Sequence, residues 1–256
     1  PAGSTLVFTA DNWDQPQVVT VAAVDDTDVE CGHTGTITHT AESGDPDYDE
    51  ITINDVTAVI ADNDQQSLGR IDYLQLEDLD PSAGDLCYRC ETTRGGFLTI
   101  EAIFDPDLGD VQLTLYDHQG SELATSSPQG GNERIDWPAG AAGETYYFKI
   151  SGTNHDVDLR LANLVQVSPD GYQVTVFGTQ EHDEFQFDAH ALSSAFAAVH
   201  QIGIKGVEYE FTFPLSPGMP ALLVTFDGGA GGDGATLTGS DGTDAATLYP
   251  TSGRMA

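Results

Sequence analysis

Acidic side chains near the start of the chain cluster in a way that suits a divalent cation. An Asp-Asp pair is followed closely by two more acids, and an Asp-Asn-Asp run comes later in the same segment. Calcium takes about six to eight oxygen ligands, which carboxylates on neighbouring loops can supply. Because the whole chain is acidic, chance clustering on a solvated surface is the alternative interpretation. The candidate ligands are Asp25, Asp26, Asp28, Glu30, Asp62 and Asp64.

A second group of aspartates ends glycine-rich turns towards the end of the chain. Gly228–Asp233 has the order Gly-Gly-x-Gly-x-Asp, and Gly239–Asp244 and Gly178–Asp183 are degenerate copies. Glycine lets a turn carbonyl and a carboxylate approach one cation closely. The irregular spacing of the copies leaves ordinary glycine turns between short strands as an alternative to a metal site. The possible weaker metal ligands are Asp183, Asp233 and Asp244.

Three cysteines cannot all pair within one chain, so at least one thiol is free or pairs elsewhere. The spacing Cys87-x-x-Cys90 is found in redox and zinc sites. Residues 86–92 read as a strand, however, in which residues three apart point to opposite faces about 10 Å apart, too far for a disulfide. Zinc would need a second ligand pair, which the sequence lacks. We expect buried thiols, with an intermolecular bond through Cys31 as the alternative.

The common catalytic motifs do not occur in the sequence. The seven histidines are scattered, without a His-Glu-x-x-His motif, and neither a Gly-x-Ser-x-Gly elbow nor a Walker-type phosphate loop is found. A pair of carboxylates suited to glycoside hydrolysis is inevitable among 42 acids, so such a pair carries no information. We therefore expect no enzymatic activity.

The balance of charge restricts the possible partners. The 42 Asp and Glu residues outnumber eight Lys and Arg, which gives a formal net charge of -34. Such a field repels nucleic acid and anionic membranes and attracts cations. No apolar run approaches the roughly 20 residues that span a bilayer. The expected partner is Ca2+, with no nucleic acid and no membrane insertion.

The acidic clusters need a scaffold, and the sequence predicts one made of strands. Apolar and β-branched residues alternate at positions such as 18–21, 51–53 and 172–176, between clusters of Gly, Pro, Asp and Asn. Only residues 189–199 have helical spacing. The expected fold class is all-β, with tandem β-sandwich segments followed by a β-rich, β-helix-like tail. The predicted segments are residues 1–66, 67–166 and 167–256.

Residues 5–64 resemble the second half of a Calx-β-like repeat. The resemblance is carried by Leu6-Val7-Phe8-Thr9, Asn12-Trp13, Pro16-Gln17, Asp25-Asp26, Glu30 and Asp62-Asn63-Asp64. It implies that Asp25, Asp26, Glu30, Asp62 and Asp64 bind calcium, whereas Asp28 is added from the cluster alone. It also implies further strands upstream. The first sandwich should then be incomplete and should need a neighbouring domain or chain to cover it.

Residues 68–165 resemble the bacterial pre-peptidase C-terminal (PPC) module, a small jelly-roll sandwich. The resemblance is carried by strands at 71–74, 96–100, 111–117, 142–150 and 157–161. It implies a scaffold without catalytic residues of its own. Separately from the resemblance, the acids Asp105, Asp107 and Asp110 could hold a second calcium ion. The tail resembles the RTX β-roll, whose glycine-rich turns bind calcium.

Together these patterns predict a non-catalytic structural or adhesive module of a large bacterial secreted or cell-surface protein, truncated at both ends. Calcium at the domain junctions would stiffen this extracellular module. Two alternatives stay open. The chain could be a spacer or targeting region of a secreted hydrolase, or a subunit of a surface layer or extracellular filament that forms a homopolymer.

Overall fold

The computed structural model describes residues 4–24, 31, 33–60, 65–127, 131–189, 197–214 and 222–239. In these residues the regular elements are strands, apart from two short 3-10 turns, η1 (Pro81–Ala83) and η2 (Pro106–Leu108). The predicted all-β class is therefore confirmed. No helix in the described part of the chain is long and apolar enough to cross a membrane.

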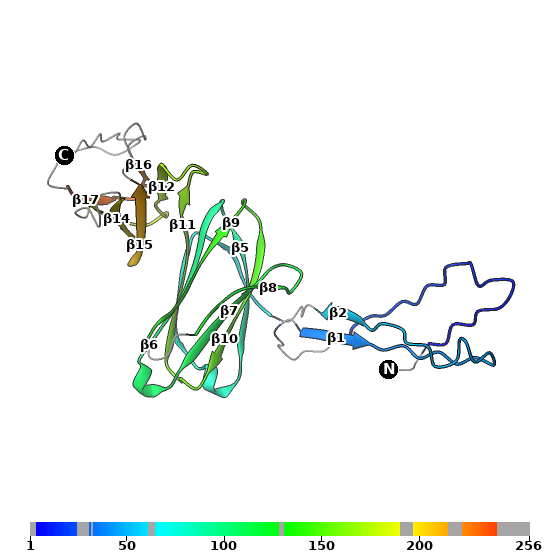
Figure 1. The fold of residues 1–256 in the computed structure, drawn as a ribbon. Helices are drawn as coiled ribbons and strands as arrows, with labels where there is room; N and C mark the ends of the chain where they lie inside the picture. Colours follow the sequence, from blue (N-terminus) through cyan, green and yellow to red (C-terminus); the bar gives the residue numbers. More distant parts are fainter. Residues whose placement is uncertain are drawn as a thin grey trace.

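The middle of the chain forms a sandwich of two sheets (Figure 1). One sheet has the order β3-β5-β10-β7-β8, with β3 parallel to β5. In the other, β11 pairs with β6 on one side and β4 on the other, and β9 lies beyond β6. The strands are β3 (Gln66–Ile71), β4 (Tyr73–Leu79), β5 (Leu86–Thr92), β6 (Gly96–Phe104), β7 (Val111–Tyr116), β8 (Glu122–Ser126), β9 (Glu133–Ala139), β10 (Thr145–Gly152) and β11 (Val157–Val167).

Strand alternation fills the space between these two sheets with apolar side chains. Leu113 and Leu115 of β7 are cross-strand partners of Ile150 and Phe148 of β10, and each of the four is at most 2% exposed. Burying side chains of this size stabilises the fold by about 1.5–3 kcal/mol each, before the entropy cost of ordering the chain. Buried residues facing them include Leu98, Ile100, Leu159 and Leu161.

Strand β11 leads from the sandwich into the tail. Its last three residues pair with β12 (Gln173–Phe177), which extends the sheet to β16 (Leu223–Asp227). The predicted segment boundary at residue 166 lies one residue before the end of β11. A second apolar cluster is centred here and includes Val165, Val174, Val176, Phe185 and Ile202.

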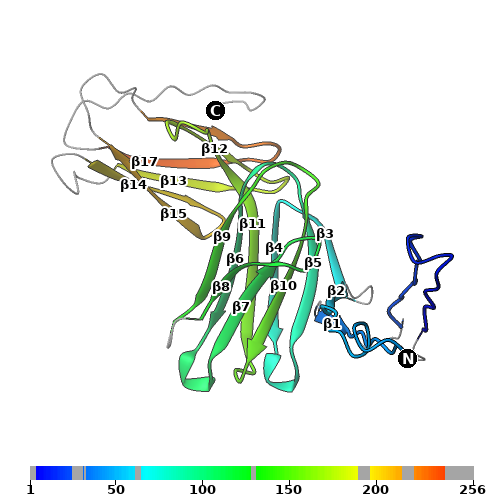
Figure 2. The ribbon, with the colours of Figure 1, turned by 45° about the vertical axis from the view of Figure 1, so that its right-hand side comes forward.

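The last sheet has the order β15-β14-β13-β17 and packs near the end of the sandwich (Figure 2). Strand β12 is parallel to β16 and β13 is parallel to β17, and both pairings join residues 50 apart, as in Gln173 with Leu223 and Glu184 with Gly234. Two strand–turn–strand units therefore lie side by side in one register. The strands are β13 (Glu184–Ala189), β14 (Ala197–Ile204), β15 (Val207–Pro214) and β17 (Gly234–Thr238).

The helical spacing of residues 189–199 is compatible with a helical turn or two, but the structure has strand where it describes them. Ala189 ends β13, and residues 197–199 begin β14. Apolar spacing in a short stretch does not separate helix from strand, and pairing with β13 and β15 decides in favour of strand here. The residues between lie outside the described residues.

The N-terminal segment contains one hairpin, β1 (His33–Ile37) and β2 (Val56–Ile60), and projects from the sandwich in Figure 1. None of its described residues is buried. Among the described residues 16 large apolar side chains are exposed, and thirteen of them belong to this segment, Trp13 at 72% and Val18 at 86% among them. Strands expected at 18–21 and 51–53 do not form, because these stretches have no neighbouring strand to pair with in the described part of the chain.

Candidate cation sites and disulfide

The six predicted N-terminal calcium ligands, Asp25, Asp26, Asp28, Glu30, Asp62 and Asp64, lie outside the described residues, as does Asp244. The strands next to them are described. His33, which follows the first acidic run, is the cross-strand partner of Ile60, which precedes the second run. Both acidic runs therefore join the hairpin at the same end.

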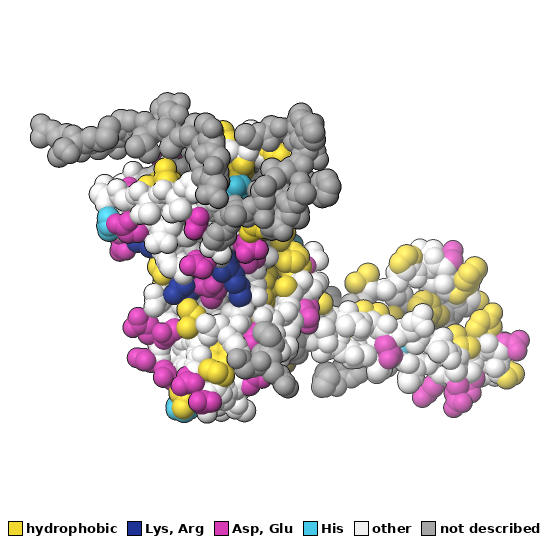
Figure 3. All heavy atoms as spheres, turned by 60° about the vertical axis from the view of Figure 1, so that its left-hand side comes forward, with side chains coloured by type: hydrophobic (Ala, Val, Ile, Leu, Met, Phe, Trp, Pro, Cys, Tyr) yellow, Lys and Arg dark blue, Asp and Glu magenta, His cyan; other side chains and the backbone are white. Residues whose placement is uncertain are grey.

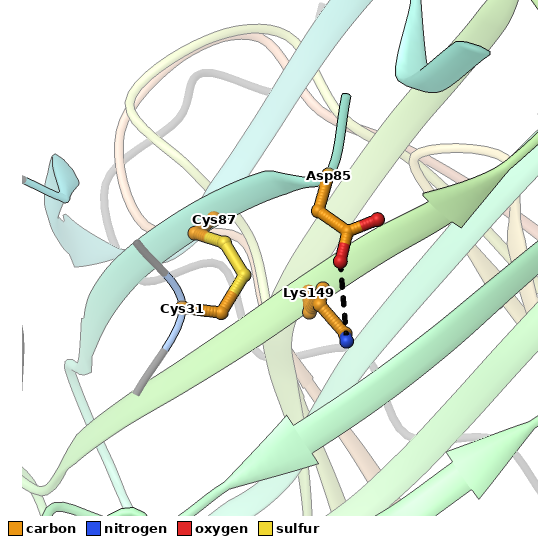
Figure 4. The surroundings of a disulfide bond; sticks show 4 residues. All are labelled: Cys31, Asp85, Cys87 and Lys149. Atoms are coloured by element: carbon orange, nitrogen blue, oxygen red, sulfur yellow. Dashed lines mark ion pairs between the residues drawn. A yellow bond between two sulfur atoms is a disulfide. The ribbon is translucent and has the colours of Figure 1, made fainter. Parts of the chain in front are cut away.

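A disulfide joins the N-terminal segment to the sandwich (Figure 4). Cys31 is bonded to Cys87 in β5, 56 positions further along the sequence, with 5.4 Å between their Cα atoms. The expected buried thiol at Cys87 is therefore replaced by an intramolecular disulfide. Nothing in the local sequence identifies so distant a partner, which only the tertiary fold brings close. Beside the bond, Lys149 forms an ion pair with Asp85 at 3.3 Å.

The third cysteine is a buried free thiol, as expected. Cys90 lies on the other face of β5 from Cys87 and is fully buried. Burial, with a smaller contribution from Glu91, raises its pKa to about 12. Because the thiolate is the reactive form, this thiol is inert in the folded protein. The argument that strand geometry prevents a bond between Cys87 and Cys90 is confirmed.

The structure brings two of the possible tail ligands together. Gly178–Asp183, the first turn, joins β12 to β13, and Gly228–Asp233, the second turn, joins β16 to β17. The N–H of Asp183 donates to Oδ1 of Asp233 at 3.1 Å, and the N–H of Gly234 donates to the carbonyl of Asp183 at 2.8 Å. A carboxylate of one turn thus accepts a backbone N–H of the other.

The first turn also satisfies its own carboxylate. Asp183 is fully buried, and its oxygens accept hydrogen bonds from the N–H and hydroxyl of Thr179. Lys205, at the tip of the β14–β15 hairpin, places its Nζ 3.2 Å from Asp183 Oδ1. Burial, the largest single effect, would lower the pKa of Lys205, but the hydrogen bonds and charges of Asp183 and Glu181 together raise it.

The acids at 105–110 serve the local turn. Asp105 caps η2, because its side chain accepts the N–H of Asp107 at 3.0 Å. The backbone of Asp110 accepts N–H groups from Thr153 and Asn154. Within the described ranges, no three His, Cys, Asp or Glu side chains converge closely enough to hold a metal ion.

One carboxylate is buried in the sandwich without a complete set of partners. Glu133 is 0% exposed; its Oε2 accepts the hydroxyl of Ser126 at 2.6 Å, while its Oε1 has no hydrogen-bond partner in the described structure. Burial raises the pKa of Glu133, against the lowering effect of Ser126 and with a contribution from the charge of Asp110. Sequence reasoning did not single out this residue, since nothing in its local sequence marks it as buried.

Several basic side chains lie between the sandwich and the last sheet (Figure 3). Arg134 and Arg160 both form ion pairs with Glu101, at 2.7 and 3.1 Å, and Arg160 also donates to the carbonyl of Gly206. The hydroxyl of Tyr209 lies 2.9 Å from that of Thr99 in a buried hydrogen bond. The contacts of Thr99 and Arg160 tie β15 and its hairpin to β6 and β11.

No family model matches the sequence, and no curated protein matches it. Among solved structures, a region covering 38% of this chain resembles the pre-peptidase C-terminal domain of a collagenase from Bacillus anthracis. The likeness covers 92% of that domain, with 12% sequence identity and a TM-score of 0.29. It is a likeness in fold over that region.

Proposed function

We propose that this chain is a non-catalytic, extracellular structural module in which calcium stiffens the junction between the N-terminal segment and the sandwich. The observation that carries the proposal is the β1–β2 register, which joins both acidic runs to one end of the hairpin. That end leads into β3 and the sandwich. Carboxylates converging there would hold a cation at the junction.

The disulfide supports the extracellular part of the proposal. Disulfides form and persist in oxidising surroundings such as the cell exterior, and are rare where thiols are kept reduced. Cys31, which directly follows the first acidic run in sequence, is bonded to Cys87 in β5. Calcium would then act on a junction whose two sides are already linked.

A partner that covers the N-terminal segment is the second part of the proposal. Thirteen large apolar side chains of this segment are exposed, and none of its described residues with an assigned burial is buried. This is more apolar surface than a monomer normally leaves in water. Residues 1–64 contain fourteen acids and no Lys or Arg. Two copies pairing through this face would repel each other, so a homopolymer would need bound cations. A neighbouring strand-forming segment that is less acidic fits the face better.

Calcium binding at the junction can be tested with Asp62→Asn/Asp64→Asn. In the parent chain, calcium should slow limited proteolysis between Ile60 and Gln66 and raise the melting temperature, and chelation should reverse both effects. The double variant should lose the response, because calcium prefers charged carboxylates. Asp14→Asn/Asp55→Asn, which changes two exposed acids outside the runs, should keep it. If chelation altered neither measurement in the parent chain, the calcium proposal would fail.

A further inference from the structure

A positive charge occupies the first turn, next to its buried carboxylate. The Nζ of Lys205 lies 3.0 Å from the carbonyl oxygen of His182, 3.2 Å from Asp183 Oδ1 and 3.5 Å from Glu181 Oε2. The Lys205 side chain is 15% exposed, whereas that of Asp183 is fully buried. Oxygens of three consecutive residues therefore meet one ammonium group that comes from another hairpin.

The position of this ammonium group follows from the stacking of the two turns. In the second turn, the Asp233 carboxylate receives the backbone N–H of Asp183. In the first turn the corresponding carboxylate is that of Asp183. Within the described part of the chain, no preceding turn stacks on it to donate a backbone N–H. Lys205 supplies the missing donor to Asp183 and ends the series of hydrogen bonds on that side.

We propose that the ammonium group of Lys205 is the resident cation of the first turn, so that this turn does not depend on calcium. Calcium needs about six to eight oxygens at about 2.3–2.6 Å, and an ammonium already in the site would repel a second cation. Lys205 is the single Lys or Arg between Arg160 and Arg254. The inference is independent of calcium at the N-terminal junction.

Lys205→Met tests the proposal, because methionine keeps most of the side-chain volume and removes the charge. Hydrogen exchange is read at the amides of Thr179 and Asp183, which donate to the carboxylates of the two turns. In the parent chain, protection should be equal with calcium and with chelator. In the variant, exchange should be at least about tenfold faster, since a buried carboxylate has lost its charge partner. Millimolar calcium should restore part of the protection in the variant only.

Lys149→Met is the matched control, because Lys149 is also partly buried and paired with one carboxylate. It should leave the amides of the first turn unchanged. Asp183→Asn/Lys205→Met guards against simple unfolding. With both charges removed, exchange should return towards the parent rate.

Two results would overturn the assignment: calcium-dependent protection of these amides in the parent chain, or equal behaviour of Lys205→Met and Lys149→Met. The assignment would also be contradicted if the amides of Asp183→Asn/Lys205→Met were no better protected than those of Lys205→Met. The test of the N-terminal junction reads cleavage between Ile60 and Gln66. Failure of one proposal is therefore distinguishable from failure of the other.

Discussion

At the scale of single residues, the environment of Glu133 conflicts with a charged carboxylate. It is fully buried, one oxygen lacks a partner in the described structure, and its pKa is raised. A raised folded-state pKa means that the protonated acid is the better-tolerated form. The contribution of Glu133 to stability is therefore fully present below the ordinary carboxyl pKa of 4.5 and is lost as the pH rises through the folded-state value.

Glu133→Gln should therefore raise the melting temperature at pH 7, by an amount equivalent to about 1 kcal/mol. Glutamine keeps an acceptor for Ser126 and carries no charge to desolvate. The gain should shrink as the pH falls through the raised folded-state pKa of Glu133 and should be gone below about pH 4.5, where the parent glutamate is protonated. Thermal melts from pH 4 to 8 would measure the gain in melting temperature. Glu77→Gln, which changes an exposed glutamate of β4, is the control. A gain that did not depend on pH would contradict the explanation.

At the scale of elements, the two stacked turns depend on glycine where their backbones approach. A Cβ on Gly178 would lie 2.3 Å from the carbonyl oxygen of Gly228, which no real contact allows. A Cβ on Gly232 would meet nothing within 4 Å. Substitution by alanine can therefore be compared at a glycine without room for a Cβ, Gly178, and at one with room, Gly232.

Gly178→Ala should destabilise the tail, because the added methyl group would push the second turn away from the first. A loss of about 1–3 kcal/mol is typical of overpacking. Gly232→Ala should be close to neutral. Hydrogen exchange in β12, β13, β16 and β17 would measure both, and equal effects of the two variants would show that the turns are not stacked this closely.

The strands of the sandwich could be predicted from sequence, and those of the N-terminal segment could not. Apolar side chains alternate strongly at residues 86–92, 96–100 and 111–117. The structure has strands at these places, because each segment pairs with strands on both sides or has a buried face. Residues 18–21 alternate just as clearly and remain without a pairing strand among the described residues. Periodicity reports a tendency, whereas pairing needs a neighbour.

The contacts between distant residues were beyond sequence reasoning. The spacing of Cys87 and Cys90 excluded a bond between them but did not point to Cys31. The glycine turns suggested Asp183 and Asp233, which the fold brings together, but no local signal linked Lys205 to Asp183. Each of these pairs depends on the path of the chain through the whole fold.

At the scale of the whole molecule, the exposed apolar face of the N-terminal segment should be measurable. We expect the chain to bind the dye ANS, and Phe8→Ser/Trp13→Ser to reduce that binding without lowering the melting temperature of the sandwich, because both side chains are more than half exposed. Leu108→Ser, which changes an exposed leucine in η2, should leave dye binding almost unchanged. Unchanged dye binding in the double variant would show that the face is covered in solution.

The Cys31–Cys87 bond has a mechanical consequence. If the chain carries tension, a pull entering on the N-terminal side of Cys31 passes through the sulfur atoms directly into β5, in the body of its sheet. The hairpin β1–β2 and strands β3 and β4 lie in the stretch of chain that this bond closes into a loop, so the covalent path of the pull bypasses them. Calcium could then set how freely the junction bends, while the covalent bond sets how far it can extend.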